Sequence, residues 1–231
     1  AQSWNFALCS FENAPRVHIA KLLSKRLRKN FWGHDIPREE FDEAFKWVNE
    51  HFSILYHADG SLSTMDSILE RLRVAVMRYG IRGTVIDPYN YILREKTSSE
   101  TDWISDMLTK IKTFCIAHGV HCWFVAHPTK PPQQVNGKEP PLPTGYSISG
   151  SHAWFDKADC GLTVHRTEKE PNFPIVKIWK VRFAWIGKQG KTYLAYDPIS
   201  TTYVTELTRD TVPDIDGTAD EWDWNEQEGS F

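Results

Sequence analysis

The sequence lacks any long apolar run and any amino-terminal signal-peptide pattern. A membrane-spanning helix needs about 18 or more consecutive apolar residues, and a secretory signal combines a basic start with an apolar core. Neither pattern is present, so the sequence argues against membrane insertion and against secretion. We expect no membrane partner.

Cysteine is scarce, and its spacing argues against the common structural metal sites. The four cysteines are Cys9, Cys115, Cys122 and Cys160, and none of them form the closely spaced pairs that bind zinc. Each lies within an apolar segment. This pattern predicts buried, reduced thiols in a cytosol-like compartment.

An excess of positive charge is also missing. The 231 residues carry a formal net charge of −3, and 41% of them are apolar and 25% charged. This balance is ordinary for a globular domain, and the length allows one good-sized core or two small ones. Because there is no overall basic field, any contact with nucleic acid must come from a local patch.

Strand and helix patterns alternate in the first part of the chain. Strands are expected at 4–10, 53–57, 83–87 and 120–126. Helices are expected from the capping residue Asn13 to about Arg28, from Pro37 to about Phe52, from the capping residue Thr64 to about Tyr79, and from Asp102 to His118. This alternation predicts parallel βαβ units.

After Cys160 the pattern changes to consecutive strands at 160–165, 175–183, 191–196 and 202–205. The predicted fold is therefore α/β, with a parallel core and an antiparallel extension. Because the chain opens almost directly on a strand, we also expect that an upstream part of this domain is missing.

Two segments lack periodicity. The first runs from Pro128 to Ser147 and contains six prolines, and a structureless loop of about 20 residues in a domain is usually functional or disordered. The second follows Arg209 and carries eight acids and no base. We expect this tail to be disordered, with partner binding through Trp222 and Trp224 as the alternative.

The segment Gly83-Thr-Val-Ile-Asp-Pro-Tyr-Asn90 joins a β-branched run to an acid and turn-forming residues. This pattern predicts a buried parallel strand whose carboxyl end presents Asp87 to a cleft. A carboxylate there often holds, through water, the Mg²⁺ of a bound nucleotide. The alternative is an aspartate that caps the following turn. Taken alone, Asp87 leaves both interpretations open.

Two more polar side chains follow predicted strands. Glu12 and His127 come after the first and fourth strands, so we expect them at the same sheet edge as Asp87. Glu12 could activate a water as general base, or could interact with the dipole of the following helix. His127 could sense a phosphate, or could be a structural hydrogen-bonding residue. The convergence of all three on one edge favours the functional interpretation.

Lys180 and Arg182 alternate with apolar residues on a late strand, which places both cations on one face. They could lie on an exposed face of an antiparallel sheet. Alternatively, they could reach the phosphates of a neighbouring subunit, as arginine fingers do.

These motifs, in this order, resemble the carboxyl-terminal motor domain of hexameric replicative DNA helicases of the DnaB and Twinkle type, which include phage primase-helicases. The resemblance covers roughly residues 4 to 205 and is closest to the Twinkle-like branch. The matching segments, in chain order, are Ser10-Phe11-Glu12, Ile86-Asp87, His127-Pro-Thr-Lys130, Ser149-Gly150-Ser151, Ala158-Asp159, His165-Arg166, Lys180 to Phe183, and Gly187 to Gly190.

The family's phosphate-binding P-loop, Gly-x-x-x-x-Gly-Lys-Ser/Thr, is absent from the 231 residues. The resemblance therefore implies a RecA-like P-loop NTPase core that is truncated at the N-terminus, with the first strand and the P-loop missing. Residues 1–208 would form this partial motor domain and 209–231 the acidic tail. Without the P-loop there is no cradle for the phosphates, so we expect the fragment to bind nucleotide poorly and not to hydrolyse it.

The resemblance implies ATP and Mg²⁺ as cofactors and a homo-oligomeric, hexameric ring with ATP between subunits. In such a ring Glu12 would activate the water, and Asp87 would hold Mg²⁺ through its water shell. His127 would report the state of the terminal phosphate. Arg182, with Lys180, would reach the neighbour's nucleotide.

The 128–151 loop would face the channel of the ring. Lys130, Lys138, Gly150 and Ser151 are the candidates for binding single-stranded DNA by its phosphates. A primase domain or a polymerase is a further candidate partner. The expected location is the cytoplasm, including the host cytoplasm for a phage-encoded protein, and the mitochondrial matrix is left open.

Two other functions remain as alternatives. One is another RecA-like ATPase, such as a recombinase or a ring-forming signalling ATPase. The Lys-x-Arg-Phe strand and the Gly-Ser motif argue against it. The other is a non-enzymatic assembly or binding module in which these motifs are relics.

Overall fold

A computed structural model describes residues 4–32, 35–56, 63–94, 99–129, 141–167, 170–198 and 200–204. Its centre is a four-stranded parallel sheet with the order β2-β1-β3-β4. The strands are β1 (Asn5–Ser10), β2 (Phe52–Ile54), β3 (Ile81–Asp87) and β4 (His121–Phe124). The helices that connect them are α1 (Pro15–Leu27), α2 (Arg38–His51), α3 (Met65–Tyr79) and α4 (Glu100–His118). This order confirms the predicted βαβ units.

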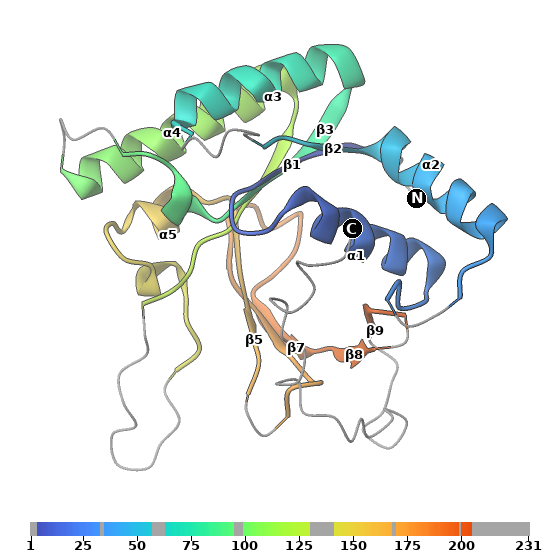
Figure 1. The fold of residues 1–231 in the computed structure, drawn as a ribbon. Helices are drawn as coiled ribbons and strands as arrows, with labels where there is room; N and C mark the ends of the chain where they lie inside the picture. Colours follow the sequence, from blue (N-terminus) through green and yellow to red (C-terminus); the bar gives the residue numbers. More distant parts are fainter. Residues whose placement is uncertain are drawn as a thin grey trace.

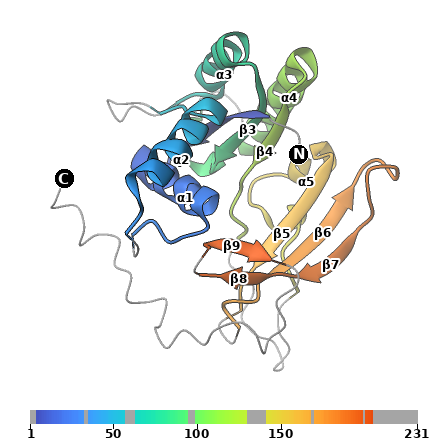
Figure 2. The same ribbon diagram turned by 90° about the vertical axis from the view of Figure 1, so that its right-hand side faces the viewer.

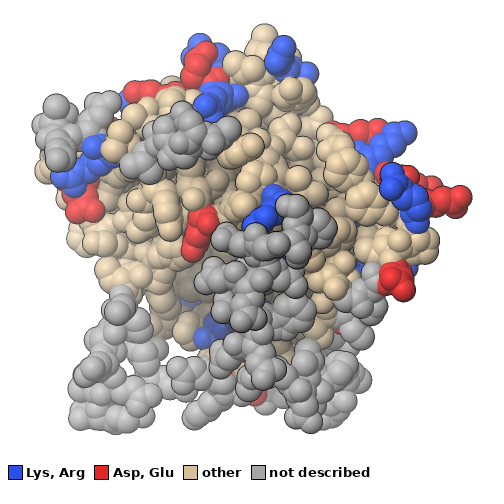
Figure 3. Space-filling model, viewed as in Figure 1, with Lys and Arg blue, Asp and Glu red and all other residues tan. Residues whose placement is uncertain are grey.

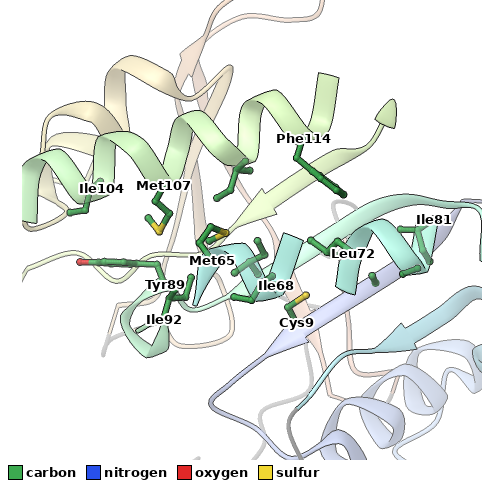
Figure 4. Close-up of a cluster of buried hydrophobic side chains, with 14 of the residues drawn as sticks. Cys9, Met65, Ile68, Leu72, Ile81, Tyr89, Ile92, Ile104, Met107 and Phe114 are labelled. Carbon is green, nitrogen blue, oxygen red and sulfur yellow. The ribbon is translucent and has the colours of Figure 1, made fainter. Parts of the chain in front are cut away.

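The helices cover the two faces of this sheet unequally. The pair α3 and α4 lies on one face, and α1 and α2 lie on the other, towards β2 (Figure 1). The main core fills the space between α3, α4 and the central strands, where Ile68, Leu72 and Ile104 are almost fully buried (Figure 4). A smaller cluster around Leu23 and Val48 joins α1 to α2. Apolar burial therefore fixes the central strands β1 and β3.

A second, antiparallel sheet follows with the order β5-β6-β7. Its strands are β5 (Cys160–His165), β6 (Ile175–Val181) and β7 (Gly190–Tyr193), and the hairpin of β8 (Ala195–Asp197) and β9 (Thr202–Val204) comes after them. The hairpin lies close to α1, where Lys25 Nζ donates to Thr201 O at 2.5 Å (Figure 2). The short helix α5 (Ala153–Lys157) precedes β5, and single 3₁₀ turns occupy Tyr89–Tyr91 (η1) and Gly145–Ser147 (η2).

Several predicted boundaries are wrong in detail. The residue that caps α1 is Ala14 and not Asn13, and it makes no side-chain cap. The predicted strand 191–196 is divided between β7 and β8, which pair with different partners. Helix α4 begins at Glu100, two residues before Asp102, because Ser99 accepts a hydrogen bond from Asp102 N.

Two predictions of burial are also wrong. The fourth strand was expected to be a continuous buried segment, but β4 is an edge strand and Trp123 on it is exposed. Cys160 was expected to be buried and is exposed, whereas Cys9 is buried. The described residues contain no disulfide and no helix long and apolar enough to cross a membrane. The predicted tail at 209–231 lies outside the described residues.

Candidate functional site

The backbone of the two central strands positions the two candidate acids. Ser10 on β1 is in register with Asp87 on β3, and Phe11 N donates to Asp87 O at 3.0 Å just beyond the strand ends. Glu12 therefore follows β1 directly beside the end of β3. Because both strands run parallel, their carboxyl ends meet at the same edge, where α/β sheets bind ligands.

His127 reaches this edge from the neighbouring strand. After β4, the chain stays attached to β3 because Val125 N donates to Ile86 O at 2.9 Å. This places His127 Nε2 3.9 Å from Glu12 Oε2, with the two side chains 58% and 47% exposed. The predicted convergence of Glu12, Asp87 and His127 is thus present in the geometry, and water reaches the acid and the histidine.

Two buried polar atoms near these residues were missed in the sequence. Among the described residues, Ser10 Oγ and His18 Nε2 are buried without a hydrogen-bond partner. Burial lowers the pKa of His18, as does the charge of Lys21, and the carboxylate of Asp87 opposes this shift. Ser10 could have been noticed, because it precedes Phe11 and Glu12 in the same motif. His18 gives no sequence signal, because it lies one turn into α1.

The two predicted cations lie on the same face, as expected, and are held within the chain. Lys180 Nζ donates to Phe155 O and, at 3.0 Å, to Asp156 O. Arg182 Nη2 donates to Asp156 O at 2.8 Å, and its Nε pairs with Asp159 at 2.8 Å. These carbonyls end the short helix α5, where a positive charge is favourable.

The predicted DNA-binding residues are only partly within the described chain. Lys130 and Lys138 lie outside it. Gly150 has a φ of +92° and packs against the first turn of α4, where Thr101 Oγ1 donates to Gly150 O at 2.7 Å. Ser151 Oγ accepts from Ala153 N at 3.0 Å and so begins α5. Both residues have a structural role, and their contact with DNA stays a prediction.

The charge distribution and the metal-binding capacity of the described residues add two observations. On the face shown in Figure 3, acidic and basic side chains are interspersed over α2 and α3. In the described segments there is no group of three or more His, Cys, Asp or Glu residues that could hold a metal ion on its own.

Comparison with known proteins gives one family and one curated relative. Residues 3–133, more than half of the chain, match the model of the family described as "AAA domain". The "Twinkle homolog protein, chloroplastic/mitochondrial" of Arabidopsis thaliana is 44% identical over 213 residues, which are 87% of this chain. The chain spans 30% of the length of that relative.

Two solved structures have a similar fold. One is a separately solved ATPase domain, which matches with a TM-score of 0.70 and 18% identity, over 88% of this chain and 75% of the other. A DnaB-like replicative helicase, described with its interactions with primase, matches with a TM-score of 0.67 and 18% identity. That match covers 87% of this chain and 50% of the helicase. The chain therefore belongs to the AAA domain family, and its fold is the RecA-like ATPase domain of DnaB- and Twinkle-type helicases.

Proposed function

We propose that this chain is the motor domain of an ATP-dependent replicative DNA helicase, which assembles as a hexameric ring and unwinds duplex DNA by moving along single-stranded DNA. The observation that supports this most is the convergence of Glu12, Asp87 and His127 at the carboxyl edge of the parallel sheet, with 3.9 Å between Glu12 and His127. The similarity to the Arabidopsis relative and to a DnaB-like replicative helicase supports the same reaction class.

The three residues at the edge have complementary roles in this proposal. Bound magnesium nucleotide would supply a phosphoanhydride that water can attack. Glu12 is the general base that takes a proton from this water, and its half-exposed carboxylate is open to solvent. Asp87 is the carboxylate that holds Mg²⁺ through water. His127 lies beside Glu12 and follows the state of the terminal phosphate.

The residues present fit the metal side of such a site and not its phosphate side. Glu12 and Asp87 supply carboxylates, the oxygen ligands that Mg²⁺ prefers, and Ser10 Oγ nearby is buried without a described partner. However, the 231 residues contain no Gly-x-x-x-x-Gly-Lys-Ser/Thr sequence, so they supply no cradle for the phosphates. We propose that the chain by itself binds nucleotide weakly and hydrolyses it slowly.

Arg182, with Lys180, is proposed to contact the nucleotide of a neighbouring subunit. Their common face supports this role, as does the partial exposure of Arg182 in its pair with Asp159. In the single chain both cations bind carbonyls at the end of α5. Assembly would then exchange these internal partners for a neighbour's phosphates, which makes hydrolysis depend on the ring.

The test is Glu12→Gln in the full-length protein, with Glu43→Gln on the exposed surface of α2 as the matched control. We expect Glu12→Gln to lower the ATPase rate by about 10²- to 10⁴-fold, because a general base contributes this much. The ring should persist in size-exclusion chromatography with light scattering. An ATPase rate equal to that of Glu43→Gln would contradict the role of Glu12.

The same protein separates the alternatives. A helicase displaces a labelled strand from a forked duplex when ATP is present, whereas a recombinase or signalling ATPase hydrolyses ATP without displacing the strand. An assembly module without enzyme activity would show neither. The cytoplasmic location stays a prediction, and the name of the Arabidopsis relative places that protein in chloroplasts and mitochondria.

A further inference from the structure

Three aromatic rings form a continuous stack between η2, α5 and β6. Tyr146 and Phe155 are stacked with centroids 4.2 Å apart and an angle of 15° between their planes. Phe155 and Trp179 continue the stack at 5.5 Å and 24°. The rings come from residues up to 33 positions apart in the sequence, so tertiary packing and not local sequence builds the stack.

The inner end of the stack is tightly fixed. A Cβ atom at Gly161 would lie 2.1 Å from the Trp179 ring, so this ring lies flat against the backbone of β5. At Gly145 a Cβ atom would lie 2.8 Å from Trp179 and 3.1 Å from the backbone of Phe155. The backbone next to Tyr146 is therefore pressed against the rings behind it, which holds the Tyr146 ring in its orientation.

The outer end of the stack is open. Tyr146 is 55% exposed although one face of its ring covers Phe155, so much of the remaining surface is free to solvent. The exposed residues near it are polar: Ser149 follows it in the chain, and His152 lies 5.6 Å away at a steep angle. A fixed, open aromatic ring with polar surroundings suits a planar ligand that also carries polar groups, such as a nucleobase.

The position of Tyr146 connects it to the candidate site. Thr129, two residues after His127, donates to Ser147 O from its backbone N at 2.8 Å and from its Oγ1 at 2.9 Å. Gly150 and Ser151, the predicted DNA contacts, follow shortly after Ser147. Tyr146 thus lies between the chain that leaves the acidic edge and the motif that is expected to face the DNA.

We propose that the outer face of the Tyr146 ring stacks against one base of single-stranded DNA, with Phe155 and Trp179 as its support. This inference rests on the proposed function, because it names a contact for the strand that the ring would enclose. It adds a base contact to phosphate contacts, and it is independent of base identity since every base has a flat aromatic face.

The test compares Tyr146→Ala, Tyr146→Phe and the control Tyr79→Ala in the full-length protein. Tyr79 ends α3 and is similarly exposed, at 53%. Binding is measured by fluorescence anisotropy with labelled oligodeoxythymidine and with an abasic strand of the same length. Circular dichroism checks that each variant is folded.

Stacking predicts that Tyr146→Ala weakens binding of oligodeoxythymidine by about 5- to 150-fold, the range for loss of one stacked base. Binding of the abasic strand should be unchanged. Tyr146→Phe, which keeps the ring, and Tyr79→Ala should bind both strands as the wild type does. The factor for Tyr146→Ala should be similar at low and high salt, because salt weakens phosphate contacts and not stacking.

Three outcomes would overturn the inference. If Tyr146→Ala binds oligodeoxythymidine as the wild type does, the platform is absent, while wild-type binding still supports the proposed function. If Tyr146→Ala loses both strands equally, the residue supports the loop and does not contact a base. If the wild type binds neither strand, the proposed function fails, and the inference fails with it.

Discussion

On the central strands of the parallel sheet, Ala7, Cys9 and Ile86 are almost fully buried, whereas Leu162 and Val164 of the antiparallel sheet are more than half exposed. The polar groups differ in the opposite direction. At the edge of the parallel sheet the described side chains approach each other only to 3.9 Å, but the cations of the antiparallel sheet each bind several carbonyls. The buried sheet holds its functional groups by its backbone and leaves them open, and the exposed sheet engages them internally.

The largest effect is expected from Gly161→Val, which breaks the packing of the antiparallel sheet. Its new side chain would overlap the Trp179 ring, because even a Cβ atom would lie 2.1 Å from it. Overpacking of this kind costs about 1–3 kcal/mol, and we expect the upper end. Urea denaturation followed by circular dichroism measures the loss. Gly190→Val at the exposed start of β7 is a control, because a Cβ atom there meets nothing within 4 Å.

A smaller effect is expected from Arg182→Ala, which removes the internal partners of one cation. The half-exposed pair with Asp159 contributes little, and the bonds to the carbonyls of α5 add to it, so we expect a loss of about 1 kcal/mol. The full-length protein should also lose ATPase activity. Lys188→Ala in the following exposed turn is the control. Loss of stability with full ATPase activity would show that Arg182 only supports α5.

The smallest effect concerns pH and the buried thiol of the parallel sheet. Burial raises the pKa of Cys9 to about 12, from an ordinary value of 9.0. The folded thiol keeps its proton where the unfolded thiol loses it, so its contribution is complete below pH 9 and is lost as the pH rises towards 12. Up to a pH of about 9.5 the loss is less than about 1 kcal/mol.

Denaturation at a series of pH values tests this dependence. Cys9→Ala should flatten the decline in the free energy of unfolding above about pH 9, because it removes the buried titrating group. Cys160→Ala should leave the decline as it is, since Cys160 is exposed. Equal slopes for the wild type and Cys9→Ala would show that Cys9 does not titrate in this way.

The sequence predicted the parts of the fold that depend on local periodicity. The helical spacing of apolar residues and the capping Thr64 located α3 correctly, because Thr64 Oγ1 accepts from Ser67 N as an N-cap does. The convergence of Glu12, Asp87 and His127 was also predictable, since parallel strands end at a common edge.

The rest depends on partners that are distant in the sequence. Nothing near residue 194 indicates that the chain changes from pairing with β6 to pairing with β9, and so the strand 191–196 was not divided. The alternation at Lys180 and Arg182 predicted a shared face but not the end of α5, which lies 24 to 26 residues earlier. The position of β4 at the sheet edge was hidden in the same way, because apolar composition does not report which neighbours a strand has.

The bond between Phe11 N and Asp87 O gives the acidic edge a fixed span. Main-chain atoms set this span, so no side-chain substitution can adjust the separation of the two acids from the backbone. Side-chain length is the only variable that remains at Glu12. An aspartate there would fall short by about 1.5 Å, one carbon–carbon bond, and displacements of about 1 Å can cost roughly 10²-fold in rate. The reach of a glutamate, and not acidity alone, is what this backbone demands of a general base.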